Sequence, residues 1–181
     1  YVPETAWNED TAFNGLAAGG GGSSAYFARP AWQSGVPGIV PGTNRLLPDI
    51  ALQASIESPG FVLCSDDAYL SAPQGHCGVL FDTTDANTYT VAGGTSFAAP
   101  VFASFITMMN GVEQTHGQGN VNPILYGLAS NSTTYAAAFH DIISGGNACP
   151  AGVSNCTTPG ESGYATTPGY DEATGLGSLD F

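Results

Sequence analysis

The protein has 181 residues, 43% of them hydrophobic, so its length suits one globular domain with a sizeable core and excludes a disordered chain. It has no lysine and only two arginines, Arg29 and Arg45, against 15 acidic residues, which gives a formal net charge of -13. Phosphate binding needs clustered Lys and Arg, so nucleic acid is excluded as an expected partner. The acidity has two open interpretations: a protein that works in an acidic environment, or a secreted protein that surface charge keeps soluble.

The four cysteines form two local pairs, Cys64 with Cys77 and Cys149 with Cys156, neither with the C-x-x-C spacing of zinc or thioredoxin sites. This spacing predicts two short-loop disulfides in an oxidising compartment, and therefore a secreted or extracellular protein. No signal peptide is visible, and no apolar run reaches the roughly 20 residues that cross a bilayer, so a membrane is not an expected partner.

Glycine-rich and strand-like segments alternate in the first half of the chain. Four glycines at residues 19–22 precede two serines but lack a following Gly-Lys, which favours a substrate-lining loop over a phosphate loop. Residues 45–52 predict a strand in which Arg45 and Asp49 form a structural ion pair. Residues 60–64 and 78–81 predict two strands of a hairpin.

A strand, a glycine turn and an apolar helix follow one another in the middle of the chain. Residues 88–92 predict the strand, Gly93 and Gly94 the turn, and residues 97–109 a helix whose apolar side chains cover most of its surface, so that it is buried on nearly all sides. The helix should begin close to Ser96 or bend at Pro100, which has no N–H. Ser96 would then face free backbone N–H groups that can stabilise an oxyanion. It is a candidate nucleophile, and the alternative is an ordinary helix cap.

A long loop rich in Gly, Asn, Pro and Thr lies between two aspartates near the end of the chain, Asp141 and Asp171. Loops of this length in a compact domain are usually functional or tied down. Carboxylates and backbone carbonyls are the ligands that Ca²⁺ prefers, so a bound ion is one hypothesis and two solvated aspartates are the other.

Several motifs together resemble the sedolisin family, the serine-carboxyl peptidases. They are Gly-Thr-Ser-Phe-Ala-Ala-Pro at 94–100, Asn-Pro-Ile-Leu-Tyr at 122–126, Phe-His-Asp-Ile at 139–142 and Gly-Tyr-Asp-Glu-Ala-Thr-Gly-Leu-Gly at 169–177. The resemblance runs nearly end to end. It implies an α/β, subtilisin-like three-layer fold with a mostly parallel sheet, of which residues 1–181 form the C-terminal portion of one catalytic domain.

The resemblance also implies roles for single residues. Ser96 matches the nucleophile, whose own N–H helps to form the oxyanion hole. Calcium would bind in the loop region at about 139–177 through five residues: the carboxylates of Asp141 and Asp171 and the carbonyls of Ile142, Thr167 and Gly169. The family uses a glutamate base, which still works at acidic pH where a histidine would be protonated.

The family's glutamate and aspartate partners, and an aspartate of its oxyanion hole, lie upstream of the nucleophile. We therefore expect a missing N-terminal segment or a companion chain to supply them. The implied function is a secreted, acid-active serine endopeptidase that cleaves peptides or proteins. One alternative is a non-catalytic, calcium-stabilised peptide-binding module. Another is a Ser-His-Asp hydrolase that uses His76, His116 or His140, which the spacing does not support.

Overall fold

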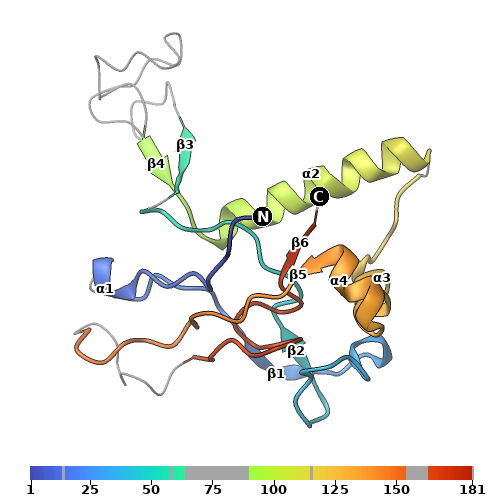
Figure 1. Cartoon of the computed structure of the whole chain (residues 1–181), viewed down its shortest axis with the longest axis horizontal. Helices are drawn as coiled ribbons and strands as arrows, with labels where there is room; N and C mark the ends of the chain where they lie inside the picture. The colour runs from blue at the N-terminus through green and yellow to red at the C-terminus, as the bar shows by residue number, and fades with distance from the viewer. Residues whose placement is uncertain (14, 58, 64–89, 115, 154–162, 181) are drawn as a thin grey trace.

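The computed structural model describes residues 1–13, 15–57, 59–63, 90–114, 116–153 and 163–180 (Figure 1). In chain order the elements are α1 (Asp10–Phe13), β1 (Gly22–Ala28), η1 (Ala31–Gln33), β2 (Asn44–Leu47), β3 (Phe61–Leu63), β4 (Thr90–Ala92), α2 (Thr95–Glu113), α3 (Asn122–Ala129), α4 (Ser132–Ala138), β5 (Phe139–His140) and β6 (Ser178–Leu179).

The described strands form three antiparallel pairs, β1 with β2, β3 with β4 and β5 with β6. The mostly parallel sheet that the family resemblance implied is absent from this part of the chain. A parallel sheet needs several strands joined by crossovers, whereas β4 pairs with β3 in the register Phe61 to Ala92. The predicted hairpin partner of β3, residues 78–81, lies outside the described residues.

The predicted order of strand, glycine turn and helix is confirmed by β4, Gly93-Gly94 and α2. Helix α2 begins at Thr95, one residue before Ser96, and Pro100 lies inside it as its sixth residue. Gly94 caps the helix with a φ of 98°, a backbone conformation that glycine adopts at little cost.

The prediction that α2 is buried on nearly all sides is wrong for this chain. None of its residues is buried. Phe102 and Phe105 pack against the core, but further along the helix Met108 is 64% and Val112 84% exposed. Figure 1 shows why: α2 runs along one edge of the molecule, and no described layer covers its outer side.

Helix α2 is also long and apolar enough, by length and composition alone, to cross a membrane. This differs from the prediction that no apolar run in the sequence is long enough to cross a bilayer. Helices from the centre of globular proteins pass the same test, because they too are apolar on most sides.

The core lies where α3, α4, β2 and the C-terminal segment meet. It consists of Val36, Leu46, Leu125, Tyr126, Ala129, Phe139, Tyr170, Leu176 and Leu179. Helix α3 opens with a proline in its first turn, and α4 is capped by the side chain of Asn131, which accepts hydrogen bonds from the N–H groups of Thr133 and Thr134. These local signals start both helices, and the core then fixes their packing.

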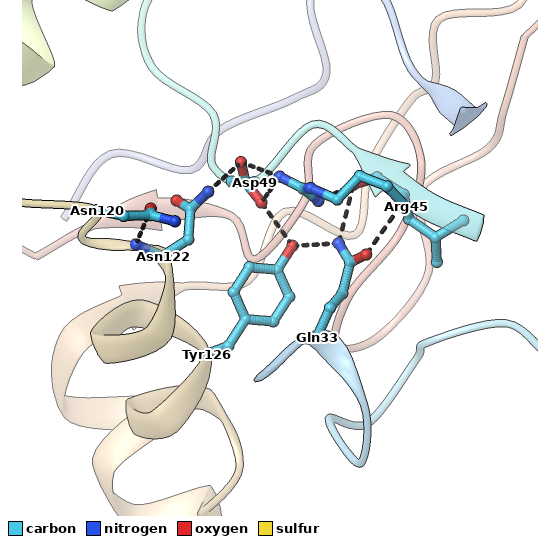
Figure 2. Close-up of polar contacts among 7 residues, drawn as sticks. Gln33, Arg45, Asp49, Asn120, Asn122 and Tyr126 are labelled. Carbon is cyan, nitrogen blue, oxygen red and sulfur yellow. Dashed lines mark hydrogen bonds and ion pairs between the residues drawn. The ribbon is translucent and has the colours of Figure 1, made fainter. Parts of the chain in front are cut away.

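A buried polar network joins α3 to β2 and η1 (Figure 2). Arg45 Nη2 lies 2.6 and 2.5 Å from the two carboxylate oxygens of Asp49, which confirms the predicted ion pair. The Tyr126 hydroxyl donates to Asp49 Oδ1 at 2.8 Å and accepts from Gln33 Nε2 at 2.8 Å. Asn122 donates to Asp49 Oδ2 at 3.1 Å. Burial and the negative charge of Asp49 raise the pKa of Tyr126, so this hydroxyl stays protonated and the network is structural.

Candidate functional site

Ser96 is the second residue of α2 and is exposed. Its N–H belongs to the first turn of the helix, where backbone N–H groups have no partner within the helix. The positive end of the helix dipole lies at the same place. An oxygen that develops negative charge beside Ser96 would therefore meet a donor and a favourable field.

A glycine turn brings the chain into this position. A Cβ atom on Gly93 would lie 2.5 Å from the carbonyl oxygen of Ala54 and 2.6 Å from that of Ser55, so only glycine fits. The N–H of Gly94 donates to the carbonyl oxygen of Ala54 at 2.6 Å. The loop at residues 54–57 thus forms the surface against which the turn before Ser96 lies.

Within the described residues, no side chain makes a hydrogen bond to the Ser96 hydroxyl. His116 lies beyond the far end of α2, whose 19 residues span about 28 Å. His140 lies instead 3.4 Å from Asp180 and stacks on Tyr1. His76 lies outside the described residues. Neither described histidine makes a hydrogen bond to Ser96, so the structure gives the Ser-His-Asp hypothesis no support for these two residues.

The structure brings Asp141 and Asp171 to the same loop, at residues 167–171. Asp141 Oδ2 accepts a hydrogen bond from the Gly169 N–H at 2.8 Å, and Asp171 Oδ2 accepts one from the Thr167 N–H at 3.0 Å. Asp171 is 5% exposed, and its Oδ1 accepts from the N–H groups of Ala173 at 2.9 Å and Thr174 at 2.7 Å. The alternative of two solvated aspartates is therefore wrong for Asp171.

Several oxygen atoms at this loop accept no hydrogen bond from the described residues. Asp141 Oδ1 is buried without a hydrogen bond. In the described part of the chain, no hydrogen bond reaches the carbonyl oxygens of Ile142, Thr167 and Gly169 either. A buried carboxylate oxygen is costly unless a donor or a cation compensates it. These carboxylate and carbonyl oxygens therefore fit a hard cation that prefers oxygen ligands.

Tyr135 is a neighbour of this loop that the sequence analysis did not identify. Its hydroxyl donates to the carbonyl oxygen of Leu176 at 3.0 Å. Burial, the charge of Asp141 and the closeness of its carboxylate to the phenol, with a smaller effect of Asp171, raise the pKa of Tyr135, although no hydrogen bond of good geometry joins Tyr135 to Asp141 Oδ1. Both carboxylates are thus close enough to act on one phenol. No group of three or more Cys, His, Asp or Glu side chains gathers anywhere among the described residues, so two carboxylates are the charged ligands available.

A cavity of about 520 Å³ lies elsewhere, and neither Ser96 nor any of the five residues predicted to bind calcium lines it. Its walls are Tyr1, Val2, Glu4, Leu52, Gln53, Phe61, Val101, His140, Ser178, Leu179 and Asp180. Cys149 is buried and disulfide-bonded. Its predicted partner Cys156 lies outside the described residues, as do Cys64 and Cys77, so both pairings stay predictions.

Comparison with known proteins defines the class. The chain is a sedolisin-like segment, homologous over nearly its whole length to peptidases of the sedolisin family. It is 32% identical over 181 residues to sedolisin of Pseudomonas sp. (strain 101), covering 99% of this chain and 24% of that protein. It is also 32% identical over 184 residues to kumamolisin of Bacillus sp. (strain MN-32), covering 97% of this chain and 26% of that protein.

The solved structure of Pseudomonas sedolisin, a serine-carboxyl proteinase complexed with two molecules of pseudo-iodotyrostatin, matches this structure with a TM-score of 0.67 at 28% identity. The match covers 99% of this chain and 39% of that chain. No family model matches the chain. The chain spans about a quarter of the length of the sedolisin and kumamolisin sequences that it matches.

Proposed function

We propose that this chain is the nucleophile-bearing portion of a secreted, acid-active serine endopeptidase. The observation that carries the proposal is the place of Ser96. It is exposed in the first turn of α2, behind a turn that only glycine can make, in a segment homologous to sedolisin-family peptidases. The disulfide at Cys149 supports an oxidising, extracellular setting.

In this mechanism the Ser96 Oγ attacks the carbonyl carbon of an extended peptide while a base removes the hydroxyl proton. The first-turn N–H groups stabilise the oxyanion. The C–N bond then breaks, the amine leaves with the proton, and water later releases the acyl group from Ser96. A carboxylate base suits a protein with no lysine, 15 acidic residues and an expected acidic setting.

We assign this base to a segment outside the 181 residues, either an N-terminal part of the same domain or a companion chain. Two observations support this assignment. Among the described residues, no side chain bonds to Ser96, and the apolar side chains of Met108 and Val112 on α2 are largely exposed. A segment that covers the N-terminal part of α2 would lie beside Ser96, because Ser96 is in the first turn of that helix.

Calcium is the cation proposed for the loop region at about 139–177. Asp141 and Asp171 would supply carboxylate oxygens, and Ile142, Thr167 and Gly169 carbonyl oxygens. The ion would compensate the buried Asp141 oxygen and hold the loop in place, without taking part in the reaction.

The second candidate is a non-catalytic, calcium-stabilised module that binds peptides. It is favoured by one observation, that Ser96 has no hydrogen-bonded base among the described residues. Binding of a peptide without cleavage at about pH 4, where a carboxylate base would still work, would favour the module.

The test is peptidase activity of the complete preparation at that pH. Ser96→Ala should abolish turnover, whereas Ser104→Ala, an exposed serine on the same helix, should leave it unchanged. Retained activity in the Ser96→Ala variant would refute the assignment. Mass spectrometry of the same preparation would identify a companion polypeptide, and its absence from an active preparation of this chain alone would refute the two-piece assembly.

A further inference from the structure

The carboxylate of Glu9 accepts three hydrogen bonds from the loop at residues 54–57 and a fourth from Trp7. Its Oε1 accepts hydrogen bonds from the Ser55 hydroxyl and from the N–H of Glu57 at 2.9 Å. Its Oε2 accepts from the N–H of Ile56 at 3.0 Å and from Trp7 Nε1 at 2.9 Å. Four donors thus meet one carboxylate, and we call this arrangement the Glu9 clamp.

The loop held by the Glu9 clamp is the one that supports the turn before Ser96. Ala54 accepts the N–H of Gly94 at 2.6 Å. A Cβ on Gly93 would lie 2.7 Å from Ile56 Cγ1 and closer still to the carbonyl oxygens of Ala54 and Ser55. A shift of residues 54–57 would therefore move the glycine turn, and with it the first turn of α2.

We propose that Glu9 is a positioning residue for Ser96: by fixing residues 54–57, its carboxylate fixes the turn that sets where the Ser96 hydroxyl stands. The inference rests on the proposed function, because positioning matters only if Ser96 reacts. The hydrogen bonds of Glu9 go to Trp7, Ser55, Ile56 and Glu57 and not to Ser96, so its effect passes through the loop and the turn. The contacts span 46 to 48 residues of sequence.

The charge state of Glu9 agrees with this role. Burial raises the pKa of Glu9, but the hydrogen bonds from Ser55, Trp7, Ile56 and Glu57 outweigh it and lower the pKa to about 2. The Glu9 clamp is therefore ionised under the acidic conditions proposed for the enzyme. A glutamine could not replace it, since its amide nitrogen donates and would face two of the four donors.

The test compares Glu9→Gln with Glu57→Gln, which removes the same charge from an exposed side chain of the loop and leaves the donating N–H in place. In the active preparation, Glu9→Gln should lower kcat about tenfold or more with KM nearly unchanged, because small misplacements of reacting groups are costly. Trp7→Phe, which removes one of the four donors, should lower kcat less, and it serves if Glu9→Gln does not fold.

A second readout does not depend on activity. Hydrogen exchange of the Gly94 amide, measured on the same variants, should be faster in Glu9→Gln than in wild type and unchanged in Glu57→Gln. Faster exchange together with a lower kcat supports the proposal. An unchanged kcat in Glu9→Gln or Trp7→Phe overturns it, whatever the exchange shows, and so does unchanged exchange at Gly94. Activity retained in Ser96→Ala would instead refute the proposed function, which separates the two failures.

Discussion

The loop around Asp141 makes a prediction whose sign depends on calcium. Without a cation, Asp141 leaves one carboxylate oxygen buried and unpaired. Asp141→Asn removes that uncompensated charge, so the apo protein should be at least as stable as wild type. With calcium present, the same substitution removes a charged ligand and should destabilise the protein relative to wild type.

The magnitude follows from linkage between binding and folding. A ligand at 100 times its Kd stabilises the folded state by about 2.7 kcal/mol. For a chain of 181 residues this corresponds to a rise in Tm of about 5 to 10 °C. Asp141→Asn should lose most of this rise, while its Tm in chelator stays within a few degrees of wild type.

Thermal unfolding in calcium and in chelator measures both effects. Asp180→Asn is the matched control, because its side chain is 54% exposed and lies in the same C-terminal segment. It should show the full calcium-dependent rise. The reasoning is refuted if calcium does not change the Tm of wild type, or if Asp141→Asn keeps the wild-type rise.

Three further predictions concern other parts of the chain. Tyr126→Phe removes a buried hydroxyl that links the Asp49 carboxylate to the Gln33 amide, and it should lower the free energy of unfolding in urea by about 1 to 3 kcal/mol. Tyr26 is 93% exposed, so Tyr26→Phe should lower it by less than about 0.5 kcal/mol. Gly93→Ala should lower the free energy of unfolding by about 1 to 3 kcal/mol or more and also lower kcat, because the added Cβ would clash with two carbonyl oxygens. Gly111 lies in α2 with open space around it, so Gly111→Ala should instead raise the free energy of unfolding by about 0.5 to 1 kcal/mol. The pKa of Glu9 falls from its ordinary 4.5 to about 2 on folding. Its stabilising contribution is therefore complete above about pH 4.5 and is lost as the pH falls through 2. Over this interval the free energy of unfolding of wild type should decline more steeply than that of Glu9→Gln.

The sequence predicted those features that are specified by residues close together in the chain. The glycine pair and the proline limited where α2 could begin, and the structure places its first residue within one position of Ser96. The four-residue spacing of Arg45 and Asp49 was enough to predict their ion pair. By contrast α4 was not predicted, because its cap Asn131 and two following threonines are also common in loops.

Contacts between segments far apart in the sequence could not be predicted from the residues on either side of each contact. The carboxylate of Glu9 meets residues 46 to 48 positions later, and Tyr135 meets Leu176 across 41 positions. Neither has a signature of charge or spacing in its own segment. The pairing of β3 with β4 was also not predicted. Cys64 and Cys77, the nearest cysteine in the sequence, favoured residues 78–81 as the partner of β3 instead.

The unfulfilled prediction about α2 bears directly on function. An apolar helix that packs Phe102 and Phe105 on the core but leaves Met108 and Val112 largely exposed is an unfavourable end state, because each exposed apolar side chain forgoes about 1.5 to 3 kcal/mol of burial. Within the part of the chain that the structure describes, Ser96 has no hydrogen-bonded base, and such a serine is likewise a weak nucleophile. Both deficits occur on one helix, with Ser96 in its first turn and Val112 near its end. One covering segment that carries an acidic residue would remove both deficits together. For that reason we favour a single catalytic domain completed by such a segment over a module that binds peptides with α2 left bare.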